Sequence, residues 1–262
     1  MKKSKFLILS ILFSMLMFSS CETLNALLGT LDGSQKAFSN DEAIQALKKA
    51  LNVGAKSASS QLGAENGYFG NTLLKIFLPP EADIIIDNID KIPFGQKMVD
   101  DVILRINRSA ENAAKEVVPI FADAIREMTI KDGIEIVYGD NRAATTYLKN
   151  KTYTKLVNLF APKMQASLSK PLVMGVSANA AWTKLVKAYN IAGALANKTA
   201  SIMGQEEPMP PITADLAEFA TGKALDGLFY KVGEEEGKIR KDPFDYASAI
   251  IQKVFGAVKN NL

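Results

Sequence analysis

The stretch "QKMVDDVILRINRSAENAAKE", residues 96–116, decides the fold class of this 262-residue chain. Apolar residues recur along it at three- and four-residue steps, which place them on one face of an α-helix. The positions that share this face, continuing just past the stretch, are Met98, Val102, Ile106, Ala110, Ala113 and Val117. The spacing therefore predicts a long amphipathic helix that packs its apolar face against the rest of the protein.

Similar helical patterns occur on both sides of this stretch. Ser39 and Glu42 have the spacing of a capping box, and the apolar face that follows them ends near Gly63. Further helices are expected at 81–92, after Pro119, at 141–150, from a cap at Thr152 to about 168, at 178–196, up to about 240, and after 242–243. We predict an all-α fold, with about ten helices in a single domain over residues 39–262.

The segment "GIEIVYG", residues 133–139, fits two structures. Ile134, Ile136 and Tyr138 alternate with other residues, as in a strand. The helical neighbours and Gly139, a common helix stop, favour a helix instead. The spacing of Thr129 and Asp132 is that of a helix cap just before it, although these two side chains could also hold a ligand.

The N-terminal residues have the order of a secretory signal. Three lysines precede an apolar run over 6–18, and two small residues, Ser19 and Ser20, precede Cys21. This end resembles the lipobox of bacterial lipoproteins, which implies cleavage before Cys21 and acylation of its thiol and amine. We therefore expect a signal peptide over 1–20 and a lipidated tether over 21–38. The alternatives are an uncleaved signal anchor and an incidental cysteine.

The resemblance to lipoproteins also suggests a location and a first partner. A lone thiol has no disulfide partner, and acylation by two or more chains gives a firm membrane anchor. In lipoproteins an Asp after the cysteine favours the inner membrane, whereas this chain has Glu22. The expectation is a protein held by its N-terminal lipid in the outer membrane and facing the periplasm, with inner-membrane anchoring as the alternative.

Composition excludes several classes of function. Three of the 31 basic residues lie in the first 20 positions, which contain no acid, so 28 basic residues face 28 acidic ones in the remainder. This balance lacks the excess positive charge of a nucleic-acid-binding protein. The absence of histidine excludes Ser-His-Asp and Cys-His catalysis and removes the usual ligands of zinc and haem. No metal and no cofactor is expected.

Two groups of polar residues stand out in the helical part. Arg108 and Glu111 are three residues apart, and Glu236 and Arg240 are four apart, so each pair can form an ion pair on one helix. Such pairs either lock helices together or line a cleft in which a carboxylate acts as acid or base. The full predicted polar network comprises Asn107, Arg108, Glu111, Thr129, Asp132, Thr145, Glu236 and Arg240.

The order and spacing of these residues, over roughly residues 40–257, resemble the DUF4197 family. The resemblance implies a secreted, mostly helical bacterial protein, and it brings no activity, because the family is one of unknown function. The matching positions are Asn107, Arg108, Ala110 and Glu111; Met128, Thr129 and Asp132; Gly139, Ala143, Ala144, Thr145 and Tyr147; and Asp226, Gly227, Leu228, Phe229, Glu236, Ile239, Arg240, Asp242 and Pro243, with 254–256.

Three functions remain open from the sequence. The first is a non-enzymatic binding module of the cell envelope, with a protein partner or an apolar molecule between its helices. The second is a carboxylate-dependent hydrolase of an envelope glycan, for which Glu111, Asp132 and Glu236 are the candidate catalytic residues. The single tryptophan argues against a sugar-binding groove. The third is a structural or assembly factor whose helices dock on a partner.

Overall fold

The helical prediction is confirmed by a computed structural model that describes residues 37–204, 209–212 and 215–260. Over these ranges the chain is all-α and has no β-strand. Its α-helices are α3 (Asn40–Leu62), α4 (Asp83–Asp87), α5 (Gly95–Ala114), α6 (Val117–Glu127), α7 (Gly133–Val137), α8 (Ala143–Ser169), α9 (Ala178–Ile202), α10 (Leu216–Lys241) and α11 (Ala249–Asn260). The predicted signal peptide, Cys21 and most of the predicted tether lie outside the described residues.

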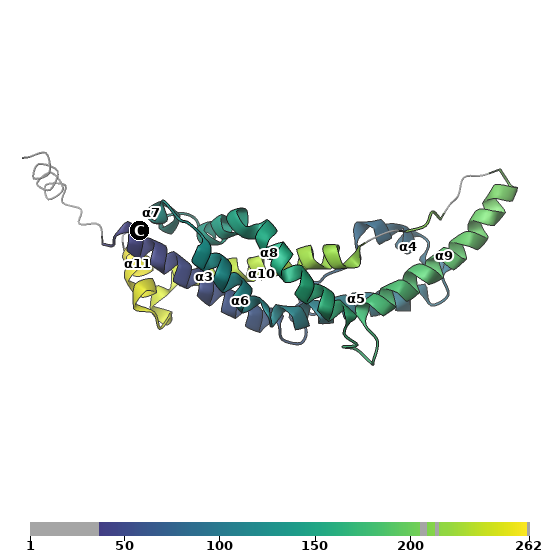
Figure 1. The fold of residues 1–262 in the computed structure, drawn as a ribbon, viewed down its shortest axis with the longest axis horizontal. Coiled ribbons are helices and arrows are strands. Elements are labelled where there is room, and N and C mark those ends of the chain that lie inside the picture. The colour runs from purple at the N-terminus through teal and green to yellow at the C-terminus, as the bar shows by residue number, and fades with distance from the viewer. Residues whose placement is uncertain (1–36, 205–208, 213–214, 261–262) are drawn as a thin grey trace, which may run out of the picture. The chain divides into compact units, whose positions relative to one another are not determined.

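The core is built around α3 and α10, which pack along each other (Figure 1). Helix α8 covers α10, while α6, α7 and α11 lie against α3. Gly54 permits the close α3–α10 contact, because a Cβ there would lie 3.0 Å from Cγ1 and 3.2 Å from the carbonyl oxygen of Val232. Buried alanines on the same face of α3 extend this contact.

Helix α5 connects this core to α9. It packs against α8, α10 and α3 on one side and against α9 on another (Figure 1). Val102, Ile106, Ala110 and Ala113 are buried, as their spacing predicts. The helix ends at Ala114, and a short turn separates it from α6, which begins at Val117.

Several local predictions need correction. The segment 133–137 is a helix, as favoured, but neither Thr129 nor Asp132 caps it. Asn40 on α3 does so instead: its Oδ1 accepts the Ile134 N–H at 3.2 Å. A tertiary contact thus replaces the expected local cap.

The predicted break at Thr152 is wrong as well. Helix α8 is continuous, and the Thr152 hydroxyl donates to the Leu148 carbonyl one turn earlier at 2.7 Å. The last predicted helix also starts later than expected. Asp242 and Pro243 open a 3₁₀ turn over Pro243–Asp245, and α11 begins only at Ala249.

Candidate functional site

Glu111 on α5 is a buried carboxylate, with 4% of its surface exposed. Its Oε1 accepts the backbone N–H groups of Tyr68 at 3.2 Å and Phe69 at 3.1 Å. Its Oε2 accepts Nη1 of Arg108 at 2.6 Å. Because buried N–H groups need partners, this carboxylate fixes the turn that follows α3 to α5.

Tyr68 extends the connection to a third helix. Its ring is fully buried, and its hydroxyl donates to the Ala224 carbonyl of α10 at 2.6 Å. Burial raises the pKa of the Tyr68 phenol well above its usual value, and the nearby Glu111 charge raises it further. The phenol therefore stays protonated and keeps its role as donor. The predicted Arg108–Glu111 pair is present, and Glu111 links α5 to the turn after α3, which Tyr68 in turn links to α10.

Asn107 and Arg108 hold the chain on either side of this turn. Asn107 is completely buried, and its amide pairs with the backbone of Ile76, accepting the N–H at 2.9 Å and donating to the carbonyl at 2.7 Å. Arg108 also donates to Oδ1 of Asn66 at 2.9 Å. The polar cluster of α5 therefore anchors the irregular segment 63–78 at both ends.

Glu236 on α10 is the second buried carboxylate, with 1% exposed. Its Oε1 accepts the Ala144 N–H at 2.9 Å, and its Oε2 accepts the N–H of Thr145 at 2.7 Å and the Thr145 hydroxyl at 2.6 Å. The first N–H groups of a helix have no partner within it, and a negative charge there is favourable. Glu236 thus caps α8 from another helix.

Arg240 completes this second cluster. It donates Nε to Glu236 Oε1 at 2.9 Å, and its other nitrogens donate to the carbonyls of Val137 at 2.6 Å and Ile136 at 3.0 Å, at the end of α7. Its guanidinium also lies over the Phe255 ring of α11. The predicted Glu236–Arg240 pair is present, and it joins α7, α8, α10 and α11.

Thr129 and Asp132 belong to neither cluster. They line a polar cavity of about 740 Å³ between α6, α7 and α8, together with Glu127, Lys131, Glu135, Tyr147, Lys151 and Lys155. Among the residues that the structure describes, no hydrogen bond links any two of Glu111, Asp132 and Glu236, and each contacts a different segment. The three candidate carboxylates therefore serve three different places in the fold.

Arg105 is a buried structural residue that sequence reasoning missed. Its Nε donates to Asp101 at 2.8 Å, and its Nη1 contacts the carbonyls of Val173 and Val176. These contacts hold a small hairpin whose tip, Met174, has φ +46° and is 93% exposed. The only local signal in the sequence is the four-residue spacing from Asp101.

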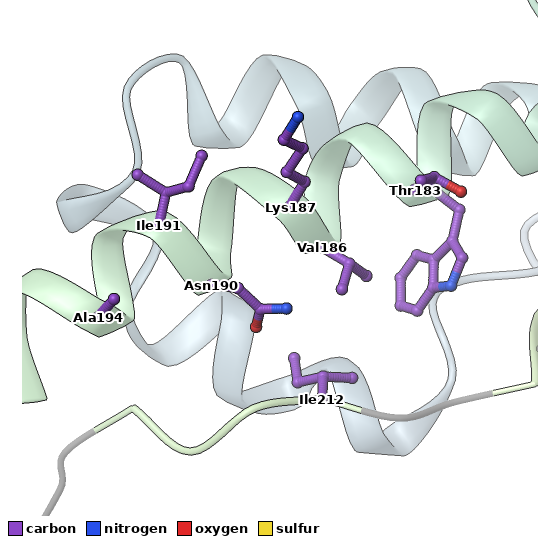
Figure 2. A pocket seen from close by; sticks show the side chains of 8 residues that line it. Thr183, Val186, Lys187, Asn190, Ile191, Ala194 and Ile212 are labelled. Carbon is purple, nitrogen blue, oxygen red and sulfur yellow. The ribbon is translucent and has the colours of Figure 1, made fainter.

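The structure also reveals an apolar groove between α5 and α9, which we name the α5–α9 groove. It encloses about 670 Å³ and is lined by Pro93, Phe94, Lys97, Met98, Asp101, Ala181, Lys184, Lys187, Ala188 and Ile191. A second pocket, of about 530 Å³, lies between α9 and the segment 209–212 (Figure 2). Asn197 pins that segment to α9 through two hydrogen bonds with the backbone of Met209.

Two further findings concern metals and membranes. Within the part of the chain that the structure describes, no three His, Cys, Asp or Glu side chains are grouped as a metal site would require. None of the helices in those ranges is both long and apolar enough to cross a bilayer.

Comparison with known proteins gives one match. The family model described as "Protein of unknown function (DUF4197)" matches residues 37–256, which is most of the chain and includes both buried clusters. Neither the search of curated proteins nor the search of solved structures found a match. The fold and the two clusters described above are thus features of a chain that belongs to the DUF4197 family.

Proposed function

We propose that this protein is a non-enzymatic binding module of the cell envelope, anchored by an N-terminal lipid and facing the periplasm. The observation that carries the proposal is the use of the two buried carboxylates. Glu111 and Glu236 accept seven hydrogen bonds between them, from backbone, hydroxyl and arginine donors. Groups so engaged support the fold and are poorly available for proton transfer.

The hydrolase alternative has weak support from this geometry. A glycosidase needs two carboxyl groups about 5–9 Å apart across one cleft. The buried carboxylates serve separate segments: Glu111 lines a pocket with Glu65, but it is engaged by two backbone N–H groups and Arg108. Asp132 lines the polar cavity between α6, α7 and α8. Glu135 lines the same cavity, while the other acid there, Glu127, is paired with Lys155. That cavity is where the alternative can be tested.

A binding role agrees with the exposed apolar side chains around α9. Contiguous apolar patches on a soluble domain mark interaction sites more often than isolated residues do. Four large apolar side chains of α9 or the residue after it are exposed, and so is the ring before α5: Ile191, Leu195, Ile202, Met203 and Phe94. The proposed partner is an envelope protein or an apolar ligand, and the proposal includes no nucleic acid.

Two assays test this proposal. Purified protein incubated with envelope glycan fragments should give no products. The same result is expected for the variants Asp132→Asn, Glu111→Gln and Glu236→Gln. Turnover that any of these variants removes, in a protein that remains folded, would establish the hydrolase instead.

The anchor is tested separately by metabolic labelling with an alkyne fatty acid. Label at the N-terminus that Cys21→Ser abolishes is the expected result. An unlabelled protein that retains residues 1–20 would overturn the anchor. Fractionation of the two membranes then distinguishes the outer membrane, which we expect, from the inner one.

A further inference from the structure

The α5–α9 groove combines an apolar lining with a group of lysines. Its volume of about 670 Å³ lies within the range of small-molecule sites. The apolar part comes from both helices and includes Phe94, Met98 and Ile191. Three lysines from the same two helices line the groove as well: Lys97, Lys184 and Lys187.

The charge of the groove is positive. In the part of the chain that the structure describes, the side-chain amines of Lys97, Lys184 and Lys187 make no hydrogen bond or ion pair with another residue. The one acid in the lining, Asp101, is bound to the buried Arg105 at 2.8 Å. An anion in the groove would therefore meet three ammonium groups and no uncompensated carboxylate of the lining.

Lys187 and Ile191 of α9 line both of its pockets, whereas Val186 and Asn190 line only the second one. Figure 2 shows Lys187 and Ile191 pointing to one side of the helix, while Val186 and Asn190 point toward Ile212 on the other. Lys187 and Ile191 are one helical turn apart, so a cation and an apolar side chain stand next to each other in the α5–α9 groove. A ligand with both an apolar and an anionic part fits this pairing.

Phe94 provides an independent reason to expect a ligand. Its φ is +58°, a left-handed conformation that favours glycine or asparagine, and the residue is 82% exposed. Gly95 beside it is needed for the turn, because a Cβ there would lie 2.7 Å from the Ile89 carbonyl oxygen. The chain thus holds a bulky apolar ring in a strained conformation and in water, at the edge of the groove. Strain of this kind is typical of ligand-binding positions.

We propose that the α5–α9 groove binds a long-chain fatty-acid anion. The acyl chain lies against Phe94, Met98 and Ile191, and the carboxylate accepts charge-assisted hydrogen bonds from the lysines. A neutral hydrocarbon would leave the lysines unused, and a small anion would leave the apolar lining in water. A long-chain fatty-acid anion uses both features. This inference rests on the proposed binding function and names its ligand class.

The test is equilibrium binding of radiolabelled palmitate to the full chain in nanodiscs of zwitterionic phosphatidylcholine, with empty nanodiscs as background. We expect saturable binding at one site per protein. The double variant Lys184→Gln/Lys187→Gln should bind about tenfold more weakly or worse, since it loses charge-assisted hydrogen bonds. The matched control is Lys198→Gln, an exposed lysine of α9 outside the groove lining, which should bind like the parent protein.

A second variant separates binding from folding. Phe94→Asn removes the ring and places a residue that tolerates the left-handed conformation, so the melting temperature should be unchanged or higher while palmitate binding weakens. Hexadecanol, which has the same chain and no charge, should bind more weakly than palmitate.

Four results would overturn the inference: no saturable palmitate binding, equal binding by the double lysine variant, equal binding of hexadecanol, or tight binding of lysophosphatidylglycerol with none of palmitate. A protein helix crosslinked in the groove of the membrane-bound protein would also overturn it. In that last case the groove would be a protein-docking site, and the proposed binding function would stand. Glycan turnover would remove the proposed binding function, whereas an unlabelled N-terminus would remove only its lipid anchor.

Discussion

Glu236 on α10 caps α8 across the core by accepting both the N–H of Thr145, at 2.7 Å, and its hydroxyl, at 2.6 Å. The residue that formally precedes the helix, Arg142, makes no side-chain cap of its own. The start of α8 is therefore fixed by a carboxylate 91 positions away in sequence. These hydrogen bonds explain why a polar side chain with 1% exposure is accommodated in the core.

The first prediction concerns this cap. Glu236→Gln keeps the shape but puts an amide NH₂ against N–H donors and leaves the Arg240 charge uncompensated. We expect a loss of about 3–5 kcal/mol in the free energy of unfolding, measured in urea. The control is Glu234→Gln on the same helix, whose partly exposed pair with Lys231 contributes less than about 1 kcal/mol. Equal losses in the two variants would refute the structural role of Glu236.

The second prediction is a pH dependence from Glu235, which contacts α3 and the segment before α11. Burial raises the pKa of its carboxyl, but hydrogen bonds from Tyr246, Lys238 and Ser57 outweigh burial, so the pKa lies below its usual 4.5. Because the folded pKa is depressed, the stabilisation is present above about pH 4.5 and is lost as the pH falls below it. Urea unfolding from pH 7 to pH 3 should show this loss.

Two variants assign that pH dependence. In Glu235→Gln the free energy of unfolding should fall less steeply below pH 4.5 than it does in the parent protein. Tyr246→Phe removes the phenol that donates at 2.8 Å and should reduce the slope in part. An unchanged slope in both variants would show that other carboxyl groups dominate acid unfolding.

The third prediction concerns Asn107 and the segment it holds. Asn107→Ala leaves the N–H and carbonyl of Ile76 without partners in a buried position, at a cost of about 1–3 kcal/mol for each unsatisfied group. Amide hydrogen exchange should become faster at residues 72–78 and remain unchanged at α11. Protection of Ile76 that persists in the variant would mean that other contacts hold this segment.

The fourth prediction concerns the hairpin after α8. Arg105→Lys keeps the charge but cannot reproduce the contacts of the guanidinium with Asp101 and the two hairpin carbonyls. We expect faster hydrogen exchange and faster proteolysis at residues 172–177, with little change in α3. The exposed Lys97→Arg, on the same helix, serves as the control. If the hairpin in Arg105→Lys is as protected as in the parent protein, Arg105 does not hold it in place.

The sequence was sufficient for the fold class and for both ion pairs, since these depend on spacing within one helix. Arg108 with Glu111 and Glu236 with Arg240 follow directly from three- and four-residue steps. The backbone partners of the two carboxylates could not be predicted, because they come from segments 42–92 positions away. Thr152 illustrates the reverse error: a residue suited to a cap donates to the preceding turn inside a helix that tertiary packing keeps continuous.

The α5–α9 groove also could not be predicted from the sequence. Its lining comes from two stretches, 93–101 and 181–191, that look separately like ordinary amphipathic helix surfaces. Only packing brings their lysines and apolar residues to one place. Phe94 carries no sequence signal either, because its unusual backbone conformation is imposed by the turn with Gly95.

The measurement that tests the central claim most directly is site-specific photocrosslinking in native membranes, read by mass spectrometry. A photoreactive residue placed at Phe94 reports on the groove, and one placed at Glu218 on exposed α10 surface is the control. The account predicts a reproducible lipid or protein adduct at position 94 that is absent at 218, on a protein whose N-terminal residue is acylated Cys21. An unoccupied position 94, together with glycan turnover by the same preparation, would contradict it.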